Sequence, residues 1–393
     1  MITKEITKDV FFLGGIDWNR RLFDSLIPLP DGTSYNAYLI RGSEKTVLLD
    51  AVDPSMAHQL LDQLKEVEKI DFIISHHAEQ DHSGAIPHVL EKYPDAKVIA
   101  TPKGKDLLID HLPIPADKIQ TVADGEELSL GNKSLKFIHY PWVHWPETML
   151  TYLKEEHILF TCDFFGSHLA TSETYVSDEC RVYEAAKRYY AEIMMPFRKI
   201  IKKNFGKLND YHIRIIAPSH GPLYHKPEFI IEAYKEWISD EPGNLVVLPY
   251  ISMHGSVEKM VETLVDALGK KGVVVQPFDL TVTDIGKLAI SLVDAATIVI
   301  GTPTVLGEPH PMVAYAARLA DLLKPKVKFA SVIATYGWGT SVVEKIAEMI
   351  PHLKVELIDP VVVKGHPKES DFRALDELAE KIAAKHRDHQ FKS

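Results

Sequence analysis

The segment SHHAEQDHSG, residues 75–84, constrains this chain more than any other feature. It follows an apolar, strand-like run, DFIIS, and precedes a helix-like run, AIPHVLEKY. Within it, His77, Glu79, Asp81 and His82 form an H-x-E-x-D-H pattern. Imidazole nitrogens and carboxylate oxygens crowded onto a tight strand-to-helix turn predict two sets of metal ligands directed at one place.

Three more residues of ligand type stand at the ends of predicted strands. They are His144 in PWVHWPETM, Asp163 in ILFTCDFFG and His220 in IRIIAPSHGP. A lone histidine after a strand is usually an ordinary core or surface residue. Three polar groups after apolar strands are different, because burying each without a metal or a partner would cost several kcal/mol. We therefore expect four histidines and three carboxylates to hold two metals, with one carboxylate shared.

This order of residues resembles the metallo-β-lactamase fold, whose hydrolases usually carry H-x-H-x-D-H and bind zinc. Glu79 stands where that pattern has a histidine, and a carboxylate in place of an imidazole favours iron over zinc. With HWPETM and the second domain described below, the chain resembles the flavodiiron proteins, or A-type flavoproteins, over essentially its whole length. The resemblance implies an N-terminal αββα sandwich and a C-terminal flavodoxin-like, doubly wound parallel sheet.

The resemblance also assigns the metal ligands residue by residue. One iron would be bound by His77, Glu79 and His144. The other would be bound by Asp81, His82 and His220, and Asp163 would bridge the two. Whether His82 is a direct ligand stays open, because its position does not ligate metal in every member of that family. The neighbouring histidines are expected to be structural or to hydrogen-bond to ligands: His76, His139, His168 and His225.

A polar stretch, ISDEPGN, places the expected domain boundary near Gly243. We expect residues 1–243 to form the metallo-β-lactamase-like diiron domain and residues 244–393 to form the flavodoxin-like FMN-binding domain. The expected strands of the second domain are Leu245–Ile251, Val273–Pro277, Thr297–Gly301, Lys328–Ala334 and, more weakly, Lys354–Leu357. Its expected helices are Val257–Leu268, Met312–Leu323, Val342–Ile350 and Phe372–Lys385. This alternation predicts a parallel sheet covered on both faces.

The pattern of the first domain predicts short strands, followed by helices and more strands. The expected strands are Val10–Leu13, Tyr35–Ile40, Thr46–Asp50, Phe72–Ser75, Leu135–His139, Met149–Leu153 and Ile158–Cys162. The expected helices are Met56–Lys65, Ala85–Lys92 and a long region over about Glu184–Lys203.

The loop after the first strand of the second domain offers hydroxyl and backbone N–H groups at a helix N-terminus, which bind anions. The order strand, Ser-x-x-Gly-Ser, helix resembles the FMN-phosphate loop of flavodoxins, although such turns also occur as simple helix caps. Glycines and aromatics in the loops after the third and fourth strands suit a flat ring at the carboxyl edge of the sheet. The expected FMN contacts are Ser252, Met253, His254, Gly255, Ser256, Val257, Pro303, Thr304, Val305, Tyr336, Gly337, Trp338 and Gly339.

Val257 departs from the flavodoxin pattern, which usually has a threonine there. The change removes one phosphate hydrogen bond and about 1–2 kcal/mol of FMN affinity unless a backbone group or a water replaces it. No G-x-G-x-x-G follows a strand anywhere in the chain, so a dinucleotide site of that type is not supported.

A flavin and two irons in one chain imply redox chemistry. The resemblance implies reduction of O2 to water, of NO to N2O and water, or both, with FMN passing electrons singly to the irons. It also implies a head-to-tail homodimer, or a dimer of dimers, in which the flavin of one subunit serves the irons of the other. Only two cysteines are present, too few for a rubredoxin-type iron site, so the electrons come from an external donor such as rubredoxin, a reductase or a reduced deazaflavin.

Composition excludes several other classes. The net charge of −11 argues against general nucleic-acid binding and against docking on anionic lipid. No apolar run approaches the ~20 residues of a membrane span, and the N-terminus lacks an apolar signal core, so we expect a cytoplasmic protein. Two alternatives remain open: a dizinc hydrolase with a flavodoxin-like module, and an electron carrier whose metal site is idle. Glu79 speaks against the first, and the complete set of seven ligands speaks against the second.

Overall fold

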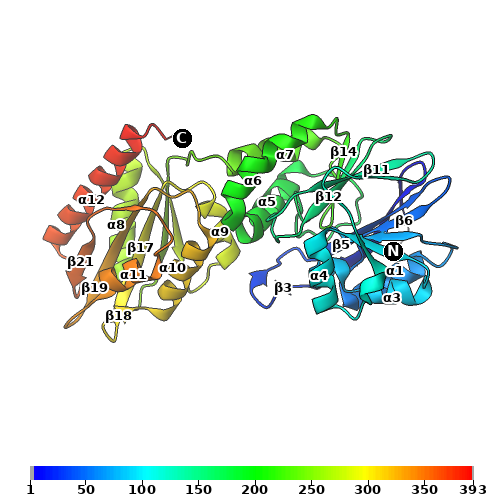
Figure 1. Ribbon diagram of the computed structural model, residues 1–393. Helices are drawn as coiled ribbons and strands as arrows, with labels where there is room; N and C mark the ends of the chain where they lie inside the picture. The colour runs from blue at the N-terminus through cyan, green and yellow to red at the C-terminus, as the bar shows by residue number, and fades with distance from the viewer. Residues whose placement is uncertain (1–3, 392–393) are drawn as a thin grey trace. The chain divides into compact units, whose positions relative to one another are not determined.

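A computed structural model describes residues 4–391 and divides the chain into two compact units (Figure 1). Within the described residues, the first unit extends to Tyr190 and resumes over Phe197–Glu236. The second comprises Ala191–Pro196 and continues from Trp237. The change of unit therefore falls a few residues before Gly243, and the assignment of residues 1–243 and 244–393 to separate cofactors stays a proposal.

The first unit is a sandwich of two sheets. The seven-stranded sheet has the order β1-β2-β5-β6-β7-β8-β9, and the five-stranded sheet has the order β10-β11-β12-β13-β14. The strands are β1 Lys4–Thr7, β2 Val10–Asp17, β5 Thr33–Arg41, β6 Thr46–Leu49, β7 Phe72–Ile74, β8 Lys97–Ala100, β9 Ile119–Thr121, β10 Glu127–Ser129, β11 Ser134–His139, β12 Met149–Leu153, β13 Ile158–Cys162 and β14 Ile215–Pro218. A separate hairpin is formed by β3 Leu22–Phe23 and β4 Ile27–Pro28.

The helices of the first unit are η1 Pro54–Met56, α1 Ala57–Gln63, α2 Gln80–Ser83, α3 Ile86–Lys92, α4 Pro102–His111, η2 Ala116–Lys118, α5 Glu179–Tyr189, α6 Arg198–Asn204, η5 Phe205–Asp210 and α7 Pro227–Trp237. Helices α1, α3 and α4 lie on one outer face of the sandwich, and α5, α6 and α7 lie on the other (Figure 1). One core lies between the two sheets, and another lies between the seven-stranded sheet and α1, α3 and α4. The expected αββα sandwich is therefore confirmed.

Strand β5 shows why the sandwich forms. All of its residues except Arg41 are buried, as expected for a central strand covered on one face by helices and on the other by the second sheet. Its Asn36 joins the sheets, because the backbone N–H donates to Ser219 O at 2.8 Å and the side-chain amide donates to Pro218 O at 2.8 Å. These bonds bring the end of β14 against β5.

The long helix expected over about Glu184–Lys203 is interrupted. Helix α5 ends at Tyr189 and is followed by η3 Tyr190–Met194, by η4 Met195–Phe197 and only then by α6. Pro196 explains the break, because proline lacks the N–H that a helix interior needs and its ring clashes with the preceding turn.

The second unit is built on a parallel sheet with the order β16-β15-β17-β19, and both β20 and β21 pair with β19. Its strands are β15 Leu245–Tyr250, β16 Val274–Asp279, β17 Thr297–Val305, β18 Glu308–Pro309, β19 Phe329–Tyr336, β20 Glu356–Leu357 and β21 Val361–Lys364. This 2-1-3-4-5 order is that of the flavodoxin-like sheet and confirms the expected fold.

Helices cover both faces of this sheet (Figure 1). Helices α8 Ser256–Lys270 and α12 Glu369–Asp388 pack together on one face, and α9 Ile285–Leu292, α10 Pro311–Leu323 and α11 Val342–Met349 form the other layer. Helix α8 presents apolar residues to the core with a spacing of three and four, as in Val257, Met260, Val261 and Leu264. Helix α9 and strand β21 were not expected. Among the described residues, no helix is both long and apolar enough to cross a bilayer.

Candidate metal centre

The expected ligands all follow strand ends at one edge of the sandwich. His77 and Glu79 lie in the turn after β7, and Asp81 and His82 lie in the short helix α2. His144, Asp163 and His220 come from the loops after β11, β13 and β14. Because β7 belongs to one sheet and the other three strands belong to the second, the sandwich itself brings these segments together.

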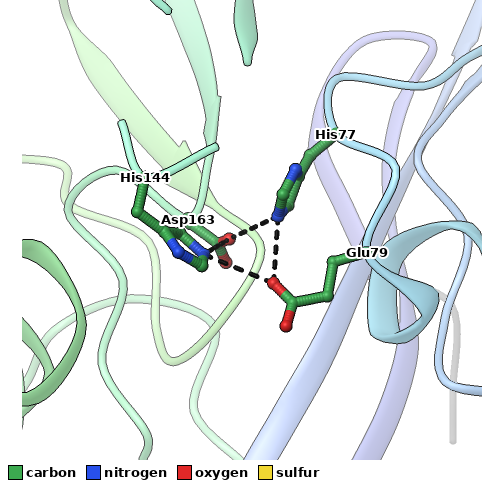
Figure 2. Close-up of side chains that lie close together, drawn as sticks. All are labelled: His77, Glu79, His144 and Asp163. Atoms are coloured by element: carbon green, nitrogen blue, oxygen red, sulfur yellow. Dashed lines mark hydrogen bonds and ion pairs between the residues drawn. The ribbon is translucent and has the colours of Figure 1, made fainter. Parts of the chain in front are cut away.

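The first group of ligands comprises His77, Glu79 and His144, with Asp163 beside them (Figure 2). The Glu79 Oε2 atom lies 3.0 Å from His77 Nε2 and 3.3 Å from His144 Nε2. Asp163 Oδ2 lies 3.4 Å from His77 Nε2 and 3.0 Å from His144 Nε2. Four ligand atoms from three segments of the chain thus point at one small volume.

The second group comprises Asp81, His82 and His220, and it meets the other oxygen of Asp163. Asp163 Oδ1 lies 2.9 Å from His82 Nε2 and 3.2 Å from His220 Nε2. Asp81 Oδ2 lies 3.1 Å from His220 Nε2. The carboxylate of Asp163 therefore divides its two oxygens between the two groups, which is the arrangement of a bridging ligand.

Buried polar atoms without hydrogen bonds support metal binding at this place. Both carboxylate oxygens of Asp81 and Nε2 of His82 are buried and make no hydrogen bond. A buried polar atom without a partner costs free energy, and native proteins pair such atoms with protein groups, water or ions. Carboxylate oxygens and imidazole nitrogens that converge in two small groups fit a pair of cations, so this donor set suits two divalent metals.

The buried acidic and basic side chains of the site strongly shift one another's pKa values. Burial disfavours a charged imidazole, but the carboxylates of Asp163 and Glu79 outweigh it and raise the pKa of His144 to about 9. The same balance, with Asp163 and Asp81 as partners, raises the pKa of His220 to about 10. Burial also disfavours the ionised form of Asp163, yet its histidine neighbours hold its pKa well below the usual range. Cations can replace the protons on these imidazoles, so metal affinity should rise with pH.

Two ligand histidines are oriented by hydrogen bonds from their far nitrogens. His77 Nδ1 donates to Glu147 Oε1 at 2.9 Å, and the same oxygen accepts from the backbone N–H of Ala78 at 3.0 Å. His220 Nδ1 donates to the Ser34 carbonyl oxygen at 2.6 Å. In both rings, the bond to Nδ1 leaves the lone pair of Nε2 free to bind a metal.

Three residues that the sequence reasoning missed support the ligands. Glu147 was visible as part of HWPETM, three residues after His144, but received no role. Asp50, buried at the end of β6, accepts from the backbone N–H of His76 at 2.9 Å and from its Nδ1 at 2.7 Å, which anchors the start of the ligand loop. Tyr189 donates its hydroxyl proton to Asp163 Oδ1 at 2.7 Å. Nothing in the sequence separates Tyr189 from other helix tyrosines.

The other histidines near the motifs belong to neither group. The imidazole of His76 lies between Asp50 and Thr151, with its Nε2 2.7 Å from the threonine hydroxyl. His168 packs against His220 with ring centroids 4.8 Å apart, and its Nδ1 lies 2.9 Å from Thr33 Oγ1. The backbone N–H of His139 donates to Asp124, and the ring of His225 packs against the ring of Tyr175, so neither residue contacts the ligand groups.

The two groups differ in exposure. The side chains of Glu79 and His144 are 16% and 15% exposed, whereas those of Asp81, His82 and His220 are at most 4% exposed. Glu79 and His144 are therefore the ligands most accessible to solvent. The ring of Phe23, from the hairpin of β3 and β4, lies 6.5 Å from the ring of His220 and helps to close the second group off.

In the second unit, the three expected flavin loops share the carboxyl edge of one sheet, after β15, β17 and β19. The second and third loops are tied together by Thr304 Oγ1, which donates to Thr340 Oγ1 at 2.9 Å. A side chain added at Gly255, Gly337 or Gly339 would meet no other atom within 4 Å, so the edge has room for a flat ligand.

Exposed apolar side chains stand beside this edge. Trp338 is 91% exposed and Leu306 is 94% exposed, which suits the face of an aromatic ring or a partner surface. Val257 points into the hydrophobic core, so only its backbone is available to a phosphate. The loops thus fit a flavin phosphate and ring, while the individual contacts remain a proposal.

Comparisons with known proteins cover both units. A family model described as ODP family beta lactamase matches residues 33–221. The chain is 36% identical over 393 residues to a nitric oxide reductase of Moorella thermoacetica, covering 97% of this chain and 98% of that protein. Among solved structures, it is similar to the rubredoxin oxygen:oxidoreductase of Desulfovibrio gigas, with a TM-score of 0.94, 29% identity and 99% of each chain covered. It is also similar to the flavodiiron protein of Giardia intestinalis, with a TM-score of 0.93, 25% identity and 99% and 98% covered.

Proposed function

The chain belongs to the flavodiiron protein family, and from this premise we propose that it is an oxidoreductase that reduces O2 to water, NO to N2O and water, or both. The reaction takes place at a non-haem diiron site and uses electrons that pass through FMN. One observation carries the proposal: Asp163 directs one carboxylate oxygen to each of two groups of buried ligands.

The chain's own residues prepare the site for two irons. We assign His77, Glu79 and His144 to one iron and the second group, Asp81, His82 and His220, to the other, with Asp163 as the bridge. The 2.9 Å separation of His82 Nε2 from Asp163 Oδ1 supports direct ligation by His82. Two ferrous ions held by these residues would supply electrons for the reduction of a diatomic molecule.

Protein groups around the ligands limit what reaches the metals. Phe23 and Tyr35 place their rings against His220, at centroid distances of 6.5 and 5.8 Å, and keep bulk water from the second group. Glu79 and His144 line the more open side, so a small gas enters there. The Tyr189 hydroxyl holds Asp163 Oδ1 in place through its hydrogen bond.

FMN belongs to the loops of the second unit. Gly255 has φ 77°, which turns the chain into α8 and places the N-terminus of that helix where it can bind a phosphate. Ser252 Oγ accepts from the Glu258 N–H at 3.1 Å, which places its hydroxyl at the same helix end. The exposed ring of Trp338 provides a stacking face for the flavin.

We also propose that the active form is a head-to-tail dimer or a dimer of dimers. Each unit carries exposed apolar side chains near its own site: Trp18, Leu22, Leu26 and Trp142 in the first, and Met253, Leu306 and Trp338 in the second. Covering such patches with a second copy would bring the flavin of one chain to the irons of the other. Sedimentation of a monomer with full activity would overturn this proposal.

The external donor is a separate redox partner, such as rubredoxin, a reductase or a reduced deazaflavin. The two free cysteines, buried Cys162 and exposed Cys180, fit a reducing compartment, and a cytoplasmic location remains our proposal.

The test combines metal analysis with gas consumption by the reduced holoenzyme. We expect about two irons per chain, one FMN and rapid multi-turnover loss of O2, NO or both. A Glu79→Ala variant should lose iron and activity together, since Glu79 supplies a ligand oxygen to the first group. Two zinc ions and no iron per chain would instead indicate a hydrolase. Flavin reoxidation without multi-turnover gas loss would indicate an electron carrier.

A further inference from the structure

Trp145 stands between the candidate metal ligands and the protein surface. Its ring meets the ring of His77 edge to face, with centroids 4.8 Å apart, and lies 6.5 Å from the ring of His144. On its other side it lies 5.8 Å from the ring of His111, an exposed residue at the end of α4. An oxidisable indole thus touches a ligand of the first group and reaches toward solvent.

The backbone holds this indole in position. The Trp145 carbonyl oxygen accepts from the Trp142 N–H at 2.7 Å and from Thr148 Oγ1 at 3.1 Å, so the loop is closed on both sides. The side chain is half-buried. Across residues 4–391, no protein acceptor takes a hydrogen bond from its indole N–H, which leaves that proton free to pass to water.

This inference rests on the proposed function: we propose that Trp145 protects the metal site by donating an electron to it. Reduction of one O2 to two waters takes four electrons: two ferrous ions supply two of them and reduced FMN supplies the other two. When only one of the two flavin electrons arrives, Trp145 supplies the fourth electron, so that both oxygen atoms still leave as water, and its indole N–H proton passes to solvent. The resulting neutral indolyl radical is restored by one electron from the external donor and one proton from water.

The position of Trp145 distinguishes it from the other oxidisable side chains. Tyr189 contacts Asp163 more directly, but it is fully buried and lacks an open path for its proton, since its hydroxyl donates to a metal ligand. Trp142 and Trp18 are more exposed, at 45% and 53%, and neither ring packs against a ligand of either group in the described structure. Among these four side chains, Trp145 alone combines contact with a ligand and partial exposure to solvent.

The experiment compares holoenzyme that has completed equal numbers of O2 turnovers with limiting or with excess reductant. Catalase is present in both arms to remove free peroxide, and oxygen uptake is followed throughout. Peptide mass spectrometry then measures oxygen addition at each tryptophan, and freeze-quenched samples are examined for an indolyl radical. The variants are Trp145→Phe and, as a matched control in the same loop, Trp142→Phe.

With limiting reductant, we expect Trp145 to gain oxygen several-fold more often than Trp142 and Trp18, whose rings do not pack against a ligand, and excess reductant should suppress the difference. Trp145→Phe should abolish the radical signal and lose iron faster over repeated limited turnovers, whereas Trp142→Phe should keep the radical. Equal or greater oxidation at Trp142 or Trp18, or a radical that persists in Trp145→Phe, would overturn the inference. Absence of O2 uptake by the wild-type holoenzyme would instead refute the proposed function.

Discussion

Replacing Glu147 should weaken metal binding at the first group of ligands without touching a ligand. Glu147 Oε1 accepts two hydrogen bonds, from His77 Nδ1 at 2.9 Å and from the Ala78 N–H at 3.0 Å. Burial opposes ionisation of this carboxyl, but the bond from His77 outweighs burial and lowers its pKa, so it is a carboxylate at neutral pH. It therefore fixes the ring of His77 and increases the basicity of the ligand nitrogen.

Two variants of Glu147 separate the effect of its hydrogen bonds from the effect of its charge. In Glu147→Ala both bonds are lost, and we expect the metal affinity of the first group to fall by about 10- to 100-fold, the usual cost of removing such a partner. The buried Ala78 N–H is then left without an acceptor, which should lower the free energy of unfolding by about 1–3 kcal/mol. In Glu147→Gln the amide oxygen can keep both bonds, because the other carboxylate oxygen has no partner to lose. Only the charge is removed, so the affinity should fall less, by about 1–2 kcal/mol or ~5- to 30-fold.

The assay is chelator competition with a divalent metal on the apoprotein, together with urea unfolding of the same apoprotein. Asp321→Asn is the matched control. Asp321 is a fully buried carboxylate in the second unit that accepts from His352 Nδ1 at 2.8 Å and from its backbone N–H at 2.7 Å. It should lose stability and keep metal affinity. Unchanged metal affinity in Glu147→Ala, or equal losses in the Ala and Gln variants, would refute the reasoning.

Three further predictions concern the bridge, the flavin loop and the C-terminal helix. Asp163→Asn should reduce bound metal from two ions per chain to at most one, because one charged bridging oxygen is replaced by an amide nitrogen; metal analysis showing two ions would contradict the bridging role. Gly255→Ala should destabilise the second unit by about 1–2 kcal/mol through its φ of 77° and weaken FMN binding, whereas Gly206→Ala, also in open space but without positive φ, should do neither in fluorescence titrations. Burial, with a smaller contribution from His389, lowers the pKa of His386 to about 4, below its unfolded value of about 6.5. The unfolded chain therefore binds this proton first, and stability that is present above pH 6.5 should fall by about 2 kcal/mol as pH falls toward 4. Urea unfolding of His386→Asn should lack this part of the pH dependence.

Much of the metal site could be read from the chain because ligand chemistry leaves a dense local signal. His77, Glu79, Asp81 and His82 fall within one turn, and a polar residue after an apolar strand is conspicuous. The helical break at Pro196 could also have been anticipated from the proline itself. The short elements β18 and β21 could not have been predicted, because two to four residues are too few to show a recognisable hydrophobic period.

The order of residues alone determines three features: the types of metal ligand, the alternation of strands and helices, and the lack of enough cysteines for a rubredoxin-type iron site. Each of them depends on local chemistry. The support of Glu147 for His77, the hold of Tyr189 on Asp163 and the contact of Trp145 with His77 depend on segments 26 to 70 positions apart along the chain. Only packing of the two sheets against each other and of α5 beside the loop after β13 brings such segments within a few ångströms. Tertiary structure therefore decided how the ligands are held and protected, and no local pattern could have specified it.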